Sequence, residues 1–211
     1  PAEIFFTSGG TEADNIAIKG VVEGLGVRNI ISSPIEHHAV THPIEEYEKK
    51  GLNVTWLDID SQGRPDLEQL EEILSQQDQT LVSLMHPNNE LGTLLEFDRV
   101  GEICEKYNAI FHSDTVQSIS NLRYDLSNSK THFITASAHK FYGPKGIGFL
   151  YMKSGMKIPP LICGGSQERN LRAGTESVAS IAAMAFALKK CYSSLEEKNA
   201  KLKKLKYHFK K

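Results

Sequence analysis

The stretch Thr135-Ala-Ser-Ala-His-Lys140-Phe-Tyr-Gly-Pro-Lys-Gly-Ile-Gly148 places a lysine between an apolar segment and a glycine-rich turn. Residues 132–135 are predicted to form a short buried strand, so the following residues leave its carboxyl end, where open α/β sheets bind their ligands. The amine of a lysine in such a place can form a Schiff base with a carbonyl compound. Lys140 is therefore a candidate site residue. The competing interpretation is an exposed loop lysine, the commoner fate of a single lysine, so companion motifs must decide.

The composition is that of one sizeable globular domain, with 211 residues, 40% hydrophobic and 24% charged. Seven of the 24 basic residues lie in residues 198–211, which contain no acid, so the remainder carries 17 basic against 26 acidic residues. This asymmetry argues against nucleic acid as a direct partner. The lysine-rich end is predicted to be a solvated helix, because apolar residues recur in it at helical intervals: Leu195, Leu202, Leu205 and Phe209.

The three cysteines stand far apart, and neither a signal peptide nor an apolar run long enough to span a bilayer is recognisable. A cytoplasmic protein without membrane contact is the expectation. No CxxC pair or His cluster has metal-ligand spacing, so we expect no metal. Because the chain begins with Pro1 close to a strand and stops within a helical pattern, we expect it to be a piece of a longer protein.

A second motif joins a strand at residues 4–6 to a helix from residue 12 through the turn Thr7-Ser-Gly-Gly-Thr11. Glycines let backbone N–H groups approach an anion, and the amino terminus of a helix favours negative charge. Gly10 and Thr11 are thus candidate phosphate ligands. An ordinary capped helix explains the motif equally well. The lysine of a Walker loop is missing.

Three further predicted strands end in polar residues. His37 and His38 follow the strand at residues 29–33, Asn89 follows residues 80–85, and Asp114 closes residues 109–114, with Gln117 just beyond. A surface histidine and an Asn-rich turn are the bland alternatives. A buried Asp must be paired, and a protonated pyridine nitrogen is one suitable partner. Strands alternate with helices throughout, which predicts an α/β fold with a mostly parallel central sheet and helices on both faces.

These motifs, in this order and at similar spacing, resemble those of the cysteine desulfurases of the NifS and IscS type. The family comprises fold-type I, class V aminotransferase-like enzymes that use pyridoxal 5'-phosphate. The resemblance covers nearly the whole chain and implies that residues 1–211 are the cofactor-binding large domain. It rests on Thr7-Ser-Gly-Gly-Thr-Glu-Ala-Asp-Asn15, Glu36-His37, Asn88-Asn-Glu-Leu-Gly92, Asp114-Thr-Val-Gln117, Ser137-Ala-His-Lys140 and Gln167-Glu-Arg-Asn-Leu-Arg-Ala-Gly-Thr175.

By this resemblance, Lys140 would hold the cofactor as a Schiff base and later move a proton. Asp114 would pair with the pyridine nitrogen and keep it protonated, so that the ring serves as an electron sink. His37 would stack on the ring and take part in proton transfer. Gln117 would hydrogen-bond the phenolate oxygen, and Asn89 would help to place the substrate carboxylate.

The resemblance also implies where the phosphate would bind. Gly10, Thr11, Ser137 and His139 would hold it within one subunit. Thr175 would reach the phosphate of the other subunit, which implies a homodimer.

The family's reaction converts L-cysteine to L-alanine and passes the sulfur as a persulfide to an enzyme cysteine, for iron–sulfur cluster assembly or tRNA thiolation. An iron–sulfur scaffold or another sulfur-acceptor protein is the implied partner. The family's nucleophilic cysteine would lie beyond Lys211, and Cys163 does not match it, so this piece alone should not complete the reaction. Two alternatives stay open: another class V enzyme, either an aminotransferase or a lyase, and a non-catalytic interaction domain with the same fold.

Overall fold

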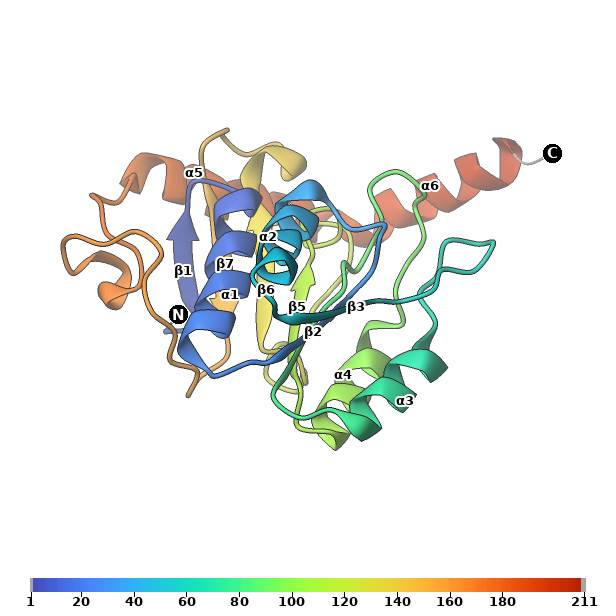
Figure 1. The fold of residues 1–211 in the computed structure, drawn as a ribbon. Helices are drawn as coiled ribbons and strands as arrows, with labels where there is room; N and C mark the ends of the chain where they lie inside the picture. Colours follow the sequence, from blue (N-terminus) through green and yellow to red (C-terminus); the bar gives the residue numbers. More distant parts are fainter. Residues whose placement is uncertain (1, 210–211) are drawn as a thin grey trace.

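The computed structural model describes residues 2–209, which form one seven-stranded sheet in the order β1-β7-β6-β5-β4-β2-β3 (Figure 1). Five strands, β3, β2, β4, β5 and β6, pair in parallel, whereas β7 runs antiparallel to both β6 and β1. The prediction of a mostly parallel sheet is therefore confirmed. The strands are β1 (Ile4–Thr7), β2 (Asn29–Ser32), β3 (Asn53–Trp56), β4 (Thr80–Ser83), β5 (Ile110–Asp114), β6 (Phe133–Ser137) and β7 (Gly148–Met152).

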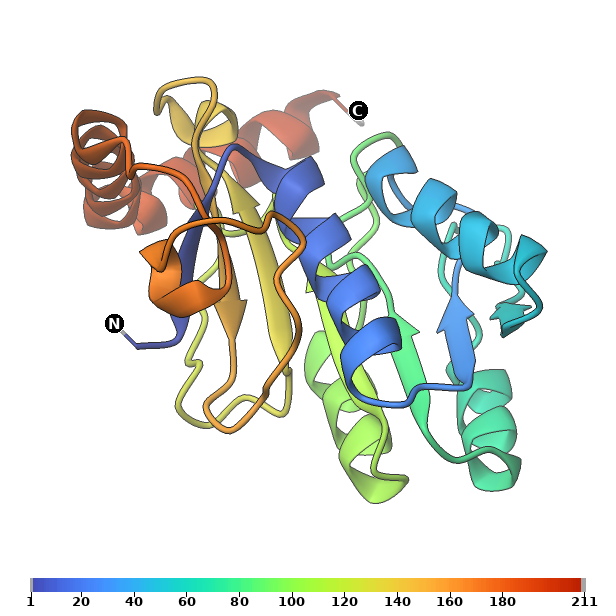
Figure 2. The ribbon, with the colours of Figure 1, turned by 60° about the vertical axis from the view of Figure 1, so that its left-hand side comes forward.

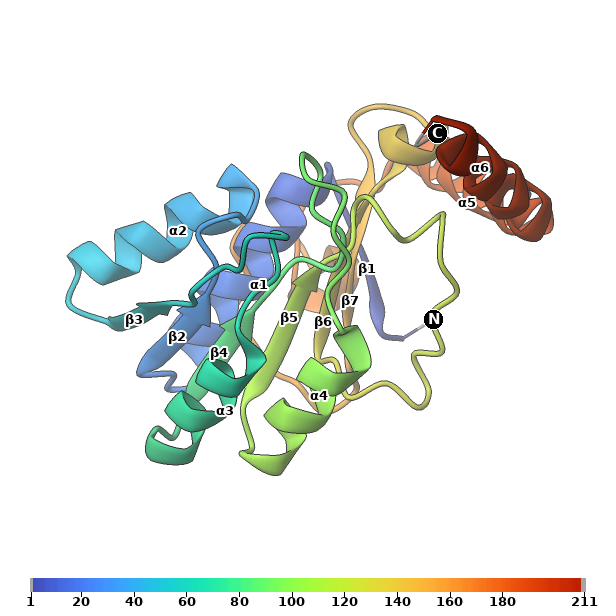
Figure 3. The same ribbon diagram turned by 90° about the vertical axis from the view of Figure 1, so that its right-hand side faces the viewer.

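Helices cover both faces of the sheet, and each face has its own apolar core (Figures 1 and 3). One core contains Ile16 of α1, Val40 of α2 and the buried β2 residue Ile30. The other contains Leu70 of α3, Val100 of α4 and the fully buried Phe111 of β5. The helices are α1 (Gly10–Gly24), α2 (His38–Lys49), α3 (Leu67–Gln76), α4 (Phe97–Lys106), α5 (Val178–Ser193) and α6 (Leu195–Phe209), with short 3-10 helices η1 (Ala138–Phe141) and η2 (Gln167–Asn170).

The lysine motif differs from the prediction in one detail. Strand β6 extends to Ser137, and the next four residues form η1 instead of an irregular loop, so Lys140 lies on a 3-10 turn at the strand end. Tyr142 closes this turn in the left-handed conformation, with φ of 65°. The lysine is thereby held one short turn beyond the carboxyl end of β6.

Helix α2 begins at His38, directly after the connection from β2. His37 is its N-cap: the ring nitrogen Nδ1 accepts a hydrogen bond from the N–H of Ala39 at 3.0 Å. The cap places this histidine at the end of the connection from β2. Asp66 caps α3 in the same way, accepting a hydrogen bond from the N–H of Gln69.

The segment around η2 covers the outer edge of β1, as Figure 2 shows in orange beside the blue strand. The Glu168 carboxylate accepts a hydrogen bond from the N–H of Phe6 at 3.1 Å, and Arg169 donates to the carbonyl oxygen of Ile4 at 2.5 Å. The Arg169 guanidinium lies 4.0 Å from the centre of the Phe5 ring. The free hydrogen-bonding groups of this edge strand are thus partly satisfied from a distant part of the chain.

Helix α6 confirms the predicted helix at the lysine-rich end, but its apolar side chains after Leu195 are exposed like the lysines. Leu195 is buried, whereas Leu202 is 51% and Phe209 is 92% exposed. Over residues 2–209, no helix combines the length and the apolar character that crossing a membrane requires. Cys104 is buried in the core as the periodicity of its helix predicts, Cys191 is also buried, and Cys163 is exposed.

Candidate functional site

A cavity of about 210 Å³ lies where the carboxyl ends of β4, β5 and β6 meet the start of α1. Nine of the ten residues predicted from the sequence line it: Gly10, Thr11, His37, Asn89, Asp114, Gln117, Ser137, His139 and Lys140. Asp14, Met85 and Val116 complete the lining and were not predicted. The tenth residue, Thr175, lies elsewhere: it lines a separate cavity of about 180 Å³ with Thr7, Ser8 and Arg172.

The amino terminus of α1 forms one wall of the 210 Å³ cavity. Its N-cap, Gly9, offers no side-chain hydrogen bond, so the first-turn N–H groups lack a side-chain acceptor at the cap. A Cβ atom on Gly10 would lie 2.8 Å from Cγ2 of Val116, closer than such contacts occur. Glycine therefore keeps open the approach to a helix terminus that favours anions.

Asp114 is buried at the end of β5, with 6% of its surface exposed. Its Oδ1 accepts a hydrogen bond from the N–H of Val116 at 2.8 Å. Burial raises the pKa of this carboxyl to about 7, and the neighbouring Asp14 adds to the effect. Within residues 2–209, no Lys or Arg forms an ion pair with it. The predicted pairing of this acid is therefore not provided by a Lys or Arg of the described residues.

The two adjacent histidines take different directions. Because Nδ1 of His37 accepts from Ala39, its other ring nitrogen is the one available for a ligand. His38 stacks instead on His42 one helical turn away, with ring centres 4.8 Å apart. The two asparagines after β4 also divide: Asn88 is buried and donates to the carbonyl oxygen of Ile35 at 2.7 Å, whereas Asn89 lines the cavity.

The lysine turn brings three polar side chains to the cavity. The Ser137 hydroxyl lies 2.9 Å from Nδ1 of His139, and the side chain of Lys140 lines the cavity with no hydrogen bond or ion pair to another described residue. Its amine is therefore free to react with a bound carbonyl compound.

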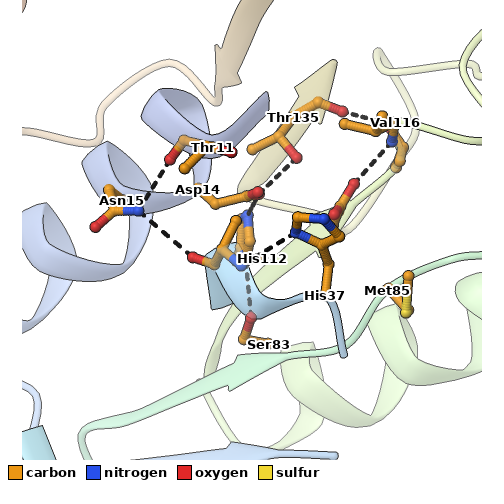
Figure 4. A network of polar contacts seen from close by, with 12 residues as sticks. Thr11, Asp14, Asn15, His37, Ser83, Met85, His112, Val116 and Thr135 are labelled. Atoms are coloured by element: carbon orange, nitrogen blue, oxygen red, sulfur yellow. Dashed lines mark hydrogen bonds and ion pairs between the residues drawn. The ribbon is translucent and has the colours of Figure 1, made fainter. Parts of the chain in front are cut away.

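A buried polar network behind the cavity was missed from the sequence (Figure 4). Oδ1 of Asp14 accepts a hydrogen bond from the Thr135 hydroxyl at 2.7 Å and lies 3.4 Å from Nε2 of His112. The other nitrogen of His112, Nδ1, lies 2.8 Å from Oγ of Ser83. The available signal was the position of Asp14, four residues after Gly10 and so on the same face of the helix, among buried apolar neighbours.

Comparisons with known proteins show the family to which the chain belongs. The Aminotransferase class-V family model matches residues 1–210. The cysteine desulfurase IscS of Dictyoglomus turgidum is 43% identical over 209 residues, covering 98% of this chain and 53% of that protein. The putative cysteine desulfurase IscS 1 of Bacillus subtilis is 45% identical over 210 residues, covering 98% and 55%. The chain thus spans about half the length of the curated relatives it matches.

Solved structures give the same result. A NifS-like protein superposes with a TM-score of 0.89 at 41% identity, over 93% of this chain and 55% of that one. The X-ray structure of a NifS-like protein from Rickettsia africae also gives a TM-score of 0.89, at 36% identity over 99% of this chain and 56% of that one. The resemblance to the NifS and IscS type is confirmed, and the chain belongs to the aminotransferase class-V family.

Proposed function

We propose that residues 1–211 are the cofactor-binding large domain of a pyridoxal 5'-phosphate-dependent cysteine desulfurase. The overall reaction would break the C–S bond of L-cysteine, add a proton to the carbon that loses sulfur, and release L-alanine. The sulfur would join an enzyme thiol as a persulfide, so that cysteine plus thiol give alanine plus persulfide, with atoms and electrons balanced. The observation that carries the proposal is the meeting of Lys140, Asp114 and His37, from three separate elements, in one cavity.

The residues of the cavity fit this cofactor. A cationic ring nitrogen requires a buried acid without a partner of its own, and Asp114 is such a group. A phosphate requires N–H donors and close backbone approach, which the start of α1 offers at Gly10. A carbonyl carbon requires an amine, which Lys140 provides. When bound, pyridoxal 5'-phosphate would supply an electron sink for the substrate's carbanion.

The protein's own residues would then hold the cofactor and move protons. Lys140 would hold it covalently through Nζ and carry a proton to and from the substrate. Asp114 would keep the ring nitrogen protonated by remaining ionised opposite it. His37 would lie over the ring, fixed by its cap bond to Ala39, and take part in proton transfer. Gln117 would donate to the phenolate oxygen.

The remaining predicted residues would bind the phosphate of the cofactor and the carboxylate of the substrate. Thr11, Ser137 and His139 would add donors to the phosphate site at Gly10, and Asn89 would bind the substrate carboxylate. Similarity to a structure titled "SspA in complex with cysteine", 36% identical with a TM-score of 0.84, supports cysteine as substrate.

The second subunit and the sulfur acceptor belong to the same proposal. Thr175 lies outside the 210 Å³ cavity and would instead bind the cofactor phosphate of a partner subunit in a homodimer. None of the three cysteines of the chain lines that cavity. The persulfide-forming cysteine would therefore come from outside residues 1–211, and a sulfur-acceptor protein such as an iron–sulfur scaffold would follow it, in the cytoplasm.

The test is cofactor binding followed by borohydride reduction. Purified protein mixed with pyridoxal 5'-phosphate should gain a visible absorption band, and reduction should fix the label on Lys140 in a peptide map. Lys140→Ala should lose both, whereas Lys145→Ala, an exposed lysine of the same loop, should keep both. Label on another residue, or a band unchanged in Lys140→Ala, would refute the assignment. Desulfuration is then assayed, as alanine formed from L-cysteine, in a longer protein that carries the persulfide-forming cysteine, because residues 1–211 alone are expected to form none.

A further inference from the structure

Three acidic side chains are buried around the cavity: Asp14 of α1 and Asp114 at the end of β5 line it, and Glu36 precedes α2. Asp14 is 1%, Glu36 8% and Asp114 6% exposed. Burial raises the pKa of Asp14 to about 7, of Glu36 to about 8 and of Asp114 to about 7. In residues 2–209 no Lys or Arg forms an ion pair with any of them. Three buried negative charges without cations are too costly, so protons must be distributed among these groups.

Glu36 accounts for one of these protons. Its Oε1 accepts hydrogen bonds from the Ser33 hydroxyl at 2.9 Å and from the N–H of Met85 at 3.0 Å. Its Oε2 is buried and has no hydrogen-bond partner. A carboxylate with one bare buried oxygen is unfavourable, whereas a neutral acid leaves much less charge without solvation. Glu36 is therefore the neutral member of the three.

Asp14 has a partner that Glu36 lacks. His112 is fully buried, with Nδ1 2.8 Å from Oγ of Ser83 and Nε2 3.4 Å from Oδ1 of Asp14. In a hydrolytic Ser-His-Asp triad the acid contacts Nδ1 and the serine contacts Nε2; here the two nitrogens are exchanged, and Ser83 is only 1% exposed. Within residues 2–209, Nε2 is buried and forms no hydrogen bond, so its 3.4 Å contact with Oδ1 of Asp14 is electrostatic. Among the described residues, the ion pair of the Asp14 carboxyl is with the His112 imidazole.

We propose that Asp14 and His112 form a net-neutral pair that holds one proton between carboxyl and imidazole, so that Asp114 alone carries negative charge at the floor of the cavity. His112 and Asp114 are two residues apart on β5 and therefore point to the same side of the sheet. A charge on Asp14 alone would be felt directly by Asp114. Neutralising Asp14 with His112 removes that repulsion, and both are positioning residues in this respect.

The same network also ties together the elements that carry the site. Asp14 belongs to α1 with Gly10, His112 to β5 with Asp114, and Thr135 to β6, which leads to Lys140 (Figure 4). Only the pairing of Asp114 with a cofactor's ring nitrogen rests on the proposed function. The number of protons on Asp14 and His112 is a property of the protein without cofactor. The other titratable groups that face the pair or share its cavity are Glu36, His37, Asp114, His139 and Lys140.

The test counts protons in the protein without cofactor. The unfolding equilibrium constant is measured in urea from about pH 5 to about pH 8, a range in which the unfolded Asp is ionised. In the folded wild type, the pair of Asp14 and His112 holds one proton. In folded Asp14→Asn, His112 is buried and neutral, so this proton is absent. The unfolding constant of the wild type should therefore rise relative to that of Asp14→Asn by about tenfold per pH unit. Asp78→Asn, at an exposed position, should run parallel to the wild type.

Parallel lines for the wild type and Asp14→Asn would overturn the proposal, because Asp14 would then be ionised beside a neutral ring. A second measurement covers the case in which Asp14→Asn does not fold. Nitrogen and carboxyl-carbon NMR shifts of the wild type near neutral pH should show either a charged His112 ring or a protonated Asp14, with the ring signal assigned by its loss in His112→Gln. A neutral ring opposite an ionised carboxylate would equally overturn the proposal. Both experiments omit pyridoxal 5'-phosphate, so a failure to bind it would not alter their outcome.

Discussion

Gly148→Ala is expected to damage the sheet next to the site. Gly148 begins β7 and pairs with Ser137 on β6 and with Thr7 on β1. A Cβ atom there would lie 2.3 Å from the carbonyl oxygen of Ala136 and 2.8 Å from Cα of Gly9. An ordinary contact of about 3.4 Å would require a displacement of about 1 Å (3.4 − 2.3), and the obstructing atoms are backbone.

The magnitude follows from that displacement. Overpacking costs about 1–3 kcal/mol where side chains can yield, so a backbone obstruction should reach the upper end, about 3 kcal/mol. For a protein of this size about 1 kcal/mol shifts Tm by about 2–4 °C, which predicts a loss of about 6–12 °C. Because the displaced strand end carries Ser137, affinity for pyridoxal 5'-phosphate should fall as well.

The assay is thermal unfolding followed by circular dichroism, with Gly101→Ala as the control. A Cβ atom on Gly101, in α4, would lie 3.0 Å from Cβ of Lys130, an atom of the loop before β6 that has to shift by only about 0.4 Å to reach an ordinary contact. Alanine is also the better helix former by about 1 kcal/mol, so this variant should melt close to the wild type. If Gly148→Ala melted as high as Gly101→Ala, the reasoning from the backbone contact would be wrong.

Three further outcomes are expected. Burial raises the pKa of Glu36 from 4.5 to about 8, so this carboxyl makes the wild type less stable as the pH rises from about 4.5 to about 8. Glu36→Gln should remove this loss of stability, which urea titrations at several pH values would show. Arg172→Ala breaks an ion pair with Glu12, whose nearest atoms are 2.7 Å apart. Burial acts to raise the pKa of Glu12, but hydrogen bonds from Arg172 and Ser8 outweigh it and lower the pKa. Urea unfolding should show a loss of about 1.5–3 kcal/mol in the free energy of unfolding, and a loss that disappears at high salt would mean that only a screened surface pair was broken. Asn88→Ala should lower the free energy of unfolding by about 1–3 kcal/mol, because it leaves buried hydrogen-bonding groups unpaired. Asn89→Ala should change it by less than about 0.5 kcal/mol. Equal effects would contradict the assignment of Asn88 to the fold and Asn89 to the cavity.

The periodic pattern was sufficient to predict the sheet and the strand ends that carry the site. Alternation of short apolar runs with amphipathic helices predicts parallel strands, and parallel strands bring their carboxyl ends to one edge. Asp114, Asn89 and Lys140 therefore share a cavity although they are far apart in the chain. Asp66 was predictable as a cap because a carboxylate before an apolar helical pattern has one common role.

The rest depended on contacts that periodicity does not encode. The antiparallel direction of β7 follows from its short connection to β6 through η1, not from its composition. The roles of Asp14 and His112 follow from a contact between residues nearly a hundred positions apart, which local patterns cannot contain. The position of Thr175, outside the cavity, is set by how its segment packs on α1 through Arg172 and Glu12.

The covered edge of β1 has a consequence for the order in which the chain folds. Phe6 pairs with Phe149 of β7, and its outer N–H bonds to Glu168, so both partners lie more than 140 residues later in the sequence. At about 5–20 residues per second, synthesis of the intervening chain takes roughly 7–30 s. The earliest strand of this chain is therefore the last to be paired, and until then its three consecutive apolar residues, Ile4, Phe5 and Phe6, are open to other nascent chains and to chaperones.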